Sequence, residues 1–361
     1  MVYPNATFHN MTSANDTTPN VVFIWRPVTA VNLSLYCSGF LLNSFLLFLL
    51  IYDSRLNHRP FHNYLITLAI GNLFNLTAGP LSLLLALADG VWIAGDAACS
   101  YILYLFWVES SAIYYNHAVI AVSRMWAIIH PVSYRNLLTN RFTICLCVCA
   151  WAFPHAVFLP FWALDTLKYR PSVKQNGYHC YVNDQAQYTY ALVGPLLLYE
   201  LPILVQILVF PVVFFTNKAR QMKCTVAPAP ISGEGPSPQP GTVQSTATNR
   251  VSRSLKPTTS AHRPSAIQTQ AVRQAKSSRA GLVLLGIMSL CALISWQPYA
   301  ICIILTTVRP DLPIPNTVWV VMNVIWTIQP TADPIIFLLA LKSLREAVER
   351  LTMRCMGICR P

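Results

Sequence analysis

The sequence predicts an all-α membrane protein, a seven-transmembrane helix bundle with a short amphipathic eighth helix. Seven long apolar stretches are separated by short polar segments. A helix needs about 20 mostly apolar residues, rising about 1.5 Å each, to cross a hydrocarbon core roughly 30 Å thick. Only 11% of the 361 residues are charged, whereas a soluble domain carries about 25%. Together these features exclude an ordinary soluble protein.

Each of the seven stretches meets the length that a spanning helix requires. In lipid, only helices and closed barrels give every backbone N–H and C=O an internal partner. Barrel strands alternate over about 10 residues, and these stretches are longer and continuously apolar. The predicted spans are residues 29–52, 62–88, 97–129, 141–165, 189–216, 280–307 and 315–341.

The same pattern divides the chain into five regions. They are an N-terminal tail (1–28), the first five helices (29–216), a third inner loop (217–279), the last two helices (280–341), and the eighth helix with the C-terminal tail (342–361). Within the loop, residues 224–278 are rich in Pro, Ser and Thr and lack apolar periodicity, which predicts a disordered segment. Two roles stay open for it, a passive linker or a site of phosphorylation.

The distribution of basic residues predicts the orientation of the bundle. The net charge is +12, but Lys and Arg cluster in alternate connections, so the charge does not indicate nucleic-acid binding. By the positive-inside rule these connections are cytoplasmic and the N-terminus is extracellular. The N-terminal tail carries three glycosylation acceptors, at Asn5, Asn10 and Asn15. We therefore expect a multi-pass protein of the plasma membrane.

Chemistry is expected at four of the 11 cysteines, all of which lie outside the apolar stretches or at their edges. Cys99 and Cys180 lie on the predicted extracellular side, where oxidising conditions favour a disulfide. Cys355 and Cys359 follow the last helix on the cytoplasmic side, where acylation is expected. The His, Asp and Glu residues form no nucleophilic or metal-binding constellation. We therefore expect no enzyme activity, no metal and no cofactor.

Sequence landmarks occur in a fixed order in nearly every predicted helix. They are Asn43, Leu68-Ala69-Ile70-Gly71-Asn72, Trp92 before Cys99, Ser123-Arg124-Met125, Pro131, Trp151, Pro202, Ser295-Trp296-Gln297-Pro298, Asp333-Pro334-Ile335-Ile336-Phe337, and Lys342-Ser343-Leu344-Arg345-Glu346-Ala347. From about residue 29 to 355 this set resembles the rhodopsin-like (class A) G-protein-coupled receptors. The resemblance implies a receptor, surrounded by membrane lipids, that binds an extracellular ligand and activates a heterotrimeric G protein. It places Arg124 and Pro131 at the coupling face.

The chain departs from this family at the contacts that hold its two states. Ser123 stands where the family has an acidic partner for the arginine, here Arg124, which favours a less restrained inactive state. Phe210 and Phe337 stand where the family has two tyrosines that hold the active arrangement, which has the opposite effect. The sign of the net bias stays open. A receptor-like protein that no longer signals but dimerises with or scaffolds other receptors is therefore an alternative.

A group of polar residues is predicted inside the bundle. Asn43, Asn72, Glu109 and Asp333 lie within apolar helices, where an ionisable residue is costly and is therefore a functional candidate. By the resemblance, Asn72 replaces an aspartate of the family's sodium pocket. Two interpretations stay open, a relocated cation or proton site and a neutral hydrogen-bonded cluster that specifies packing. His117 is interpreted as a core histidine.

The extracellular half of the bundle is predicted to bind the ligand. By the resemblance, Phe106 stands where amine receptors carry an aspartate and Thr327 where opsins carry a lysine, so neither ligand type is expected. The candidate lining is Phe106, Trp107, Ser110, Trp296, Tyr299 and Trp326. Such walls suit a neutral small molecule, a lipid or the apolar end of a peptide. The alternative is that the rings pack helix against helix.

Two further questions stay open. Lys168, Arg170 and Lys174 in the second outer loop predict a basic lip that favours an acidic peptide or an anionic headgroup, unless these charges are only solvated. Glu200 faces either the ligand cavity or the fourth helix. A transporter or channel is the alternative from another class, but it would normally show internal repeats or interrupted helices, and neither is visible.

Overall fold

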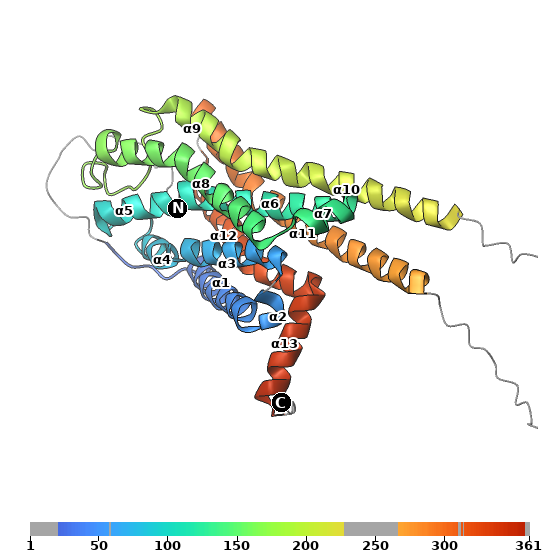
Figure 1. The fold of residues 1–361 in the computed structure, drawn as a ribbon. Helices are drawn as coiled ribbons and strands as arrows, with labels where there is room; N and C mark the ends of the chain where they lie inside the picture. The colour runs from blue at the N-terminus through green and yellow to red at the C-terminus, as the bar shows by residue number, and fades with distance from the viewer. Residues whose placement is uncertain (1–20, 58, 227–265, 310–311, 313, 358–361) are drawn as a thin grey trace, which may run out of the picture.

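The computed structural model describes residues 21–57, 59–226, 266–309, 312 and 314–357. Within these residues every regular element is a helix, and the long helices run side by side as one bundle (Figure 1). This arrangement confirms the predicted all-α membrane fold. The three predicted glycosylation sites and Cys359 lie outside the described residues.

Each predicted span corresponds to one helix or to a continuous series of helical segments. The first four are α1 (Pro27–Tyr52), α3 (Pro60–Leu76) with α4 (Gly79–Leu87), α5 (Gly95–Tyr104) with η1 (Leu105–Glu109) and α6 (Ser110–Ile129), and α8 (Asn140–Leu164) with η2 (Asp165–Tyr169). The last three are α9 (Tyr188–Pro195) with η3 (Leu196–Glu200) and α10 (Leu201–Val226), α11 (Ala266–Val308), and α12 (Asn316–Ala340). Two short helices lie between spans, α2 (Ser54–Asn57) and α7 (Pro131–Leu137).

The third span is the most polar of the seven. By length and apolar composition, five of the described helices could each cross a membrane, and the bent pair of α12 and α13 (Lys342–Cys355) adds a sixth. The series from α5 to α6 is not among them, because it carries Glu109, Asn116 and His117, which are all buried. Since α6 packs against α3, α8, α10 and α11, its neighbours shield these side chains from lipid.

Two helices extend into the segment that the sequence predicts to be disordered. α10 continues to Val226 and α11 begins at Ala266, whereas the prediction of disorder covers residues 224–278. The prediction is wrong at both ends. Residues 266–279 contain no proline and are rich in Ala, Gln, Lys and Arg, which favour helix even without apolar periodicity.

Two π-helical segments change the register of the bundle. η1 interrupts the third span and η3 interrupts the fifth. A π-helical turn contains an extra residue, so side chains before and after it no longer share the face that an unbroken α-helix would give them. η3 ends two residues before Pro202, whose nitrogen cannot donate a backbone hydrogen bond.

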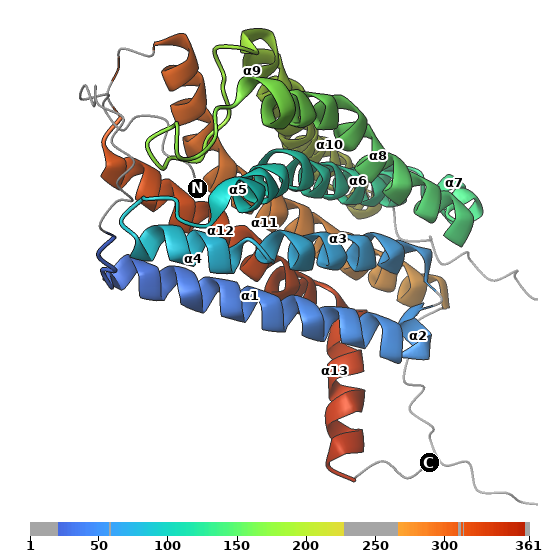
Figure 2. The same cartoon turned by 90° about the vertical axis from the view of Figure 1, so that its left-hand side faces the viewer.

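The last helix lies across the bundle. α13 leaves the end of α12 at 88° and packs against the ends of α1 and α2 (Figure 2). Its apolar face buries Leu344 and Ala347. This geometry is that of the predicted amphipathic eighth helix, which lies along a membrane surface with its charged face in water.

Candidate functional site

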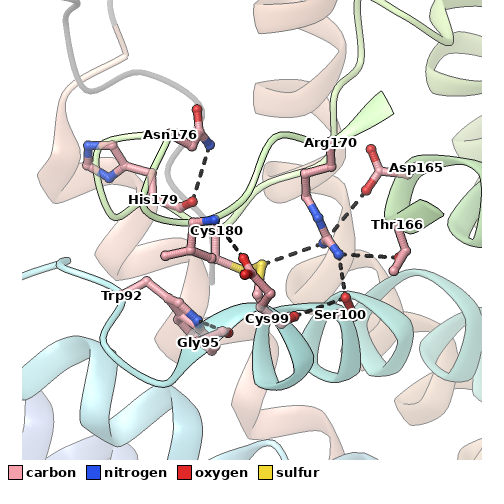
Figure 3. Close-up of a disulfide and its surroundings, with 12 residues drawn as sticks. Trp92, Gly95, Cys99, Ser100, Asp165, Thr166, Arg170, Asn176, His179 and Cys180 are labelled. Carbon is pink, nitrogen blue, oxygen red and sulfur yellow. Dashed lines mark hydrogen bonds and ion pairs between the residues drawn. A yellow bond between two sulfur atoms is a disulfide. The ribbon is translucent and has the colours of Figure 1, made fainter. Parts of the chain in front are cut away.

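A disulfide closes one end of the bundle. Cys99 at the start of α5 is bonded to Cys180 in the loop after η2 (Figure 3), which confirms the predicted pair. The loop is held by further contacts on both sides of the disulfide. The backbone N–H of Val173 donates to Asp96 Oδ1 at 2.6 Å, and the N–H of Trp92 donates to the Tyr178 carbonyl at 2.7 Å.

Arg170 holds the disulfide-bonded loop against α5 and does not form part of the predicted basic lip. Its guanidinium donates to the hydroxyls of Ser100 and Thr166 and lies 3.6 Å from Asp165 Oδ2 (Figure 3). Its side chain is only 7% exposed, so it is not presented to an incoming ligand. Of the three predicted basic residues, Lys168 and Lys174 remain exposed.

The second carboxyl group of this loop, that of Asp184, is half-buried and forms no ion pair among the described residues. Burial, with the charge of Asp165 as a smaller cause, raises the pKa of Asp184 to about 6. Burial also lowers the pKa of His179, next to the disulfide. The disulfide-bonded end of the bundle therefore contains a carboxyl group whose pKa is raised and a histidine whose pKa is lowered.

Four of the predicted ligand residues form one aromatic cluster beneath the loop. The Phe106 ring centroid lies 5.4 Å from that of Tyr299 and 5.6 Å from that of Trp326, and the Trp296 ring lies 5.5 Å from Tyr299. Each of the four residues is at most 9% exposed. The rings belong to the third, sixth and seventh spans, so the cluster joins these three helices.

The other two predicted ligand residues connect this cluster to neighbouring helices. The Trp107 ring packs edge-on against Phe106 at 5.0 Å and stacks on Phe158 of α8, with centroids 5.6 Å apart and planes 13° apart. The Ser110 hydroxyl accepts from Asn75 Nδ2 at 2.8 Å and donates to the Leu105 carbonyl at 3.0 Å. Ser110 also lines a small internal cavity of about 20 Å³ beside Trp326, which on volume alone accommodates about one water molecule.

The structure settles the orientation of Glu200. Its carboxyl oxygens accept from Trp296 Nε1 at 3.1 Å and from Gln297 Nε2 at 2.7 Å, both on α11. The preceding residue, Tyr199, stacks on Trp296 at 4.1 Å and donates through its hydroxyl to the carbonyls of Phe106 and Trp107. This junction of three helices is not predicted by the sequence, because both residues lie in the π-helical segment η3.

Three of the predicted buried polar residues meet at one centre. Asn72 Nδ2 donates to Asn43 Oδ1 at 3.2 Å and to Asp333 Oδ2 at 3.0 Å. Asn43 Nδ2 donates to the Pro330 carbonyl at 2.7 Å. That carbonyl would bond the residue four positions later in an unbroken helix, but the residue is Pro334, which has no N–H. Asn43 therefore replaces the missing donor from a neighbouring helix.

His117 completes this polar centre. Its Nε2 lies 3.1 Å from Asp333 Oδ2, and the two side chains are 1% and 2% exposed. The amide of Gln329 lies 3.4 Å from the same nitrogen, and Tyr114 donates to Gln329 Oε1 at 3.0 Å. The sequence interpretation of His117 as a core histidine omits this contact, which connects α6 directly to α12.

Glu109 lies apart from this centre. Its Oε2 is 3.8 Å from Nε2 of His155 on α8, and the Tyr104 hydroxyl lies 2.9 Å from the same nitrogen. Both carboxyl oxygens are buried without a hydrogen-bond partner among the described residues. The structure therefore separates Glu109 from Asn72 and Asp333, the residues with which it is grouped by sequence.

Arg124 is held by a ring instead of a carboxyl group. Its Cζ lies 3.4 Å from the centroid of Phe61 on α3. In the described part of the chain no ion pair involves Arg124, as Ser123 at the neighbouring position leads one to expect. Pro131 begins α7 directly after this helix, and Cys355 ends α13 with an exposed thiol.

Comparisons with known proteins agree with this architecture. A family model described as 7 transmembrane receptor (rhodopsin family) matches residues 42–337. Cysteinyl leukotriene receptor 1 of Sus scrofa is 24% identical over 198 residues, which cover 52% of this chain and 56% of that receptor. The Homo sapiens receptor 1 is 30% identical over 125 residues, 34% of this chain and 36% of the relative.

A second human relative gives the same picture. Cysteinyl leukotriene receptor 2 of Homo sapiens is 27% identical over 148 residues, which cover 41% of this chain and 42% of that receptor. The matched stretches thus span from about a third to just over half the length of these relatives. The family model, in contrast, extends from the first helix to the end of the seventh. The chain belongs to the rhodopsin family of seven-transmembrane receptors.

Proposed function

We propose that this protein is a G-protein-coupled receptor for an extracellular lipid mediator, an amphipathic molecule with an apolar body and an acidic end. The observation that carries the proposal is the aromatic cluster of Phe106, Trp296, Tyr299 and Trp326. The Glu200 carboxyl beside it accepts hydrogen bonds from Trp296 and Gln297 of α11, which fixes its orientation. Such a surface favours an apolar body.

Two observations support an acidic end on this ligand. Lys168 and Lys174 stay exposed in the loop above the cluster, and the relatives are named for cysteinyl leukotrienes. Because the rings contact one another, a ligand would insert by separating Phe106 from Tyr299 and Trp326. These three side chains lie on three different helices, so insertion would change how the helices pack at this end.

We further propose that Arg124 and Pro131 form the face that couples to a heterotrimeric G protein. Arg124 is held by its contact with Phe61, and a cation–π contact contributes roughly 0.5–2 kcal/mol. Release of this arginine therefore requires breaking a ring contact, whereas a buried ion pair would cost about 3–5 kcal/mol to break.

The test is a nucleotide-exchange assay on membranes that contain the full-length receptor and purified G proteins. Cysteinyl leukotrienes are the first probes, followed by other lipid acids and by peptides. We expect a lipid acid to stimulate exchange and Arg124→Ala to abolish this response while leaving ligand binding intact. Phe106→Leu should weaken binding about tenfold, which corresponds to about 1.4 kcal/mol. Phe142→Leu, an exposed ring on α8, is the matched control.

Two results would contradict the proposal in different ways. A response that survives Arg124→Ala would remove the coupling role of this arginine. A response to peptides alone would remove the lipid assignment while leaving the receptor function intact.

The second candidate function is a receptor-like protein that scaffolds other receptors without signalling. Phe210 packs so tightly on α11 that a Cβ at Gly286 would lie 2.9 Å from its ring, and neither Phe210 nor Phe337 can donate a hydrogen bond. The same assay distinguishes the two candidates. Surface expression without nucleotide exchange in any G-protein class, across all probes, would favour the scaffold.

A further inference from the structure

A groove of about 610 Å³ runs along the outside of the bundle between α3 and α8. Three apolar side chains that line it, Ile70, Ile144 and Val148, are exposed, so the groove opens toward the lipid that surrounds the helices. Pockets for small molecules have volumes of about 300–1,000 Å³. The groove is therefore large enough to hold one chain-like molecule that arrives from the bilayer.

One wall of the groove carries a hydrogen-bond donor without an acceptor. The indole of Trp151 lines the groove, and its Nε1 is buried without a hydrogen-bond partner among the described residues. An indole nitrogen can only donate, and in the hydrocarbon region water does not supply the missing acceptor. A ligand atom that accepts from this N–H would remove the cost of leaving it unpaired.

A buried carboxyl group lacks the opposite kind of partner. Glu109 is fully buried, and neither of its carboxyl oxygens has a hydrogen-bond partner in the described part of the chain. His155 does not meet this need, because its Nε2 lies 3.8 Å from Glu109 Oε2, beyond hydrogen-bond distance. The two ring nitrogens of His155 lie instead 2.8 Å from the Trp151 carbonyl and 2.9 Å from the Tyr104 hydroxyl. A donor from a ligand would therefore find a vacant acceptor at Glu109.

Both groups approach the same small residue, Gly71. A Cβ placed on Gly71 would lie 3.3 Å from Trp151 Cζ2, on the nitrogen side of the indole, and 3.7 Å from Glu109 Oε1. Because glycine adds no side chain here, a small polar group can approach both. A hydroxyl accepts from an N–H and donates to a carboxyl oxygen, whereas an ammonium only donates and a carboxylate only accepts. A hydroxyl is thus the group that satisfies both partners.

A cation lies beyond one end of the groove. Arg141 is exposed, and none of the ion pairs between described residues involves it. It precedes Ile144 by three residues and Val148 by seven, so it shares their face of α8. It precedes Trp151 by ten residues, which is about 15 Å of helix. A chain that lies in the groove can therefore present an anion to Arg141 and a hydroxyl to Trp151.

We propose that this groove binds a long-chain fatty acid that carries a hydroxyl group near the middle of its chain. The carboxylate pairs with the Arg141 guanidinium, and the apolar chain lies on Ile144 and Val148. The hydroxyl accepts from Trp151 Nε1 and donates to Glu109 Oε1. A sterol also has a hydroxyl on an apolar body but carries no charge, so it would leave Arg141 without an anion. The site is separate from the aromatic cluster and does not depend on G-protein activation.

The experiment measures binding of tritiated 12-hydroxyoctadecanoic acid to the full-length receptor in phosphatidylcholine nanodiscs, without G protein. Three unlabelled competitors each lack one feature. Octadecanoic acid lacks the hydroxyl, 2-hydroxyoctadecanoic acid carries it at the wrong place, and methyl 12-hydroxyoctadecanoate lacks the carboxylate. Compared with unlabelled 12-hydroxyoctadecanoic acid, we expect the first two to compete about tenfold more weakly and the methyl ester about fivefold more weakly.

Two variants locate the polar groups. Trp151→Phe removes the indole N–H and should weaken binding of 12-hydroxyoctadecanoic acid about tenfold while leaving that of octadecanoic acid unchanged. Arg141→Gln should weaken binding of both acids about fivefold and leave that of the methyl ester unchanged. Arg135→Gln, which changes an exposed arginine of α7, is the matched control and should alter none of them. If Trp151→Phe folds poorly, the competitors on wild type decide whether the hydroxyl is recognised.

Three outcomes would overturn the proposal. Equal competition by octadecanoic acid would show that the groove does not recognise the hydroxyl. Equal weakening of both acids by Trp151→Phe would assign the indole to packing alone. Full displacement of the labelled acid by cholesterol at the same concentration would assign the groove to a sterol and not to a fatty acid.

Discussion

Replacement of His117 by leucine is the sharpest test of how the bundle is held together. His117 Nε2 lies 3.1 Å from Asp333 Oδ2, and both side chains are almost completely buried. His117→Leu removes this partner and leaves that carboxyl oxygen with Asn72 alone. Loss of one member of a buried pair costs about 3–5 kcal/mol, because the remaining group keeps its desolvation cost.

The expected loss is large enough to measure as a melting temperature. At roughly 2 °C per kcal/mol, the lower rate for larger domains, His117→Leu should lower the melting temperature by about 6–10 °C. The assay is thermal unfolding of the purified receptor in detergent. The matched control is Asn116→Leu on the same helix. Asn116 donates only within its own helix, and its Oδ1 is buried without a partner among the described residues, so its loss should cost little.

A double-mutant cycle separates the pair from simple repacking. Asp333→Leu alone should destabilise the receptor, but the double variant His117→Leu/Asp333→Leu should be more stable than the sum of the two losses predicts. An apolar pair can replace a buried polar pair without leaving an unpaired group, so the coupling should exceed about 1 kcal/mol. Strict additivity, or a melting temperature for His117→Leu within about 1 °C of wild type, would refute the role assigned to this contact.

Three further predictions concern the half of the bundle that the disulfide closes. Glu200→Leu leaves the N–H donors of Trp296 and Gln297 without an acceptor. Measured by thermal unfolding, it should cost about 2–3 kcal/mol of stability, and Glu200→Gln should cost about half as much. Cys180→Ser opens a loop with a sequence separation of 81 residues and should cost about 4.5 kcal/mol, which reductant titration of wild type should reproduce. Asp184 has its pKa raised to about 6, so the folded state binds the proton more tightly than the unfolded chain. Wild type should therefore gain about 1.4 kcal/mol over Asp184→Asn as the pH falls from about 7 to about 5, and a difference of the opposite sign would contradict this. His179, with a lowered pKa, changes stability in the other direction in both proteins and cancels in the comparison.

The spans are predictable from sequence because length and apolar composition alone define them. The predicted range 29–52 corresponds to Pro27–Tyr52, and 315–341 corresponds to Asn316–Ala340. The ends near the third inner loop are not predictable in this way. There the helices continue through polar residues that favour helix without forming an apolar stripe, so periodicity gives no signal for residues 266–279.

The direction in which an individual side chain points is less predictable from sequence, in part because π-helical segments interrupt two of the spans. Phe106, Trp107 and Glu109 lie inside η1, and Glu200 lies inside η3, so α-helical spacing alone does not give their directions. A single extra residue rotates the chain by about 100° relative to an α-helix, which is enough to move a side chain from the bundle interior to the neighbouring helix. Asn43, Asn72 and Asp333 lie outside these segments, and they meet as a group.

The breaks in helix regularity and the polar junctions of the bundle occur at the same places. The Pro330 carbonyl, freed by Pro334, accepts from Asn43, and the carbonyls of Phe106 and Trp107 in η1 accept from Tyr199. In lipid, helices have little hydrophobic reason to associate, so packing and interhelical hydrogen bonds hold them together. A broken helix supplies acceptors that only a neighbour can satisfy.

These junctions also lie between the two ends for which ligand binding and G-protein coupling are proposed. On the third span, His117 follows Phe106 of the aromatic cluster by 11 residues and precedes Arg124 by 7 residues, which is about 10 Å of α-helix. On the seventh span, Asp333 follows Trp326 by 7 residues. A ligand that inserts as proposed between Phe106 and Trp326 would therefore pull on the two helices that His117 and Asp333 join. Because both side chains are buried, separating them would leave polar groups without a partner or water. That cost opposes small displacements of the two helices and favours a change in which the polar groups find new partners.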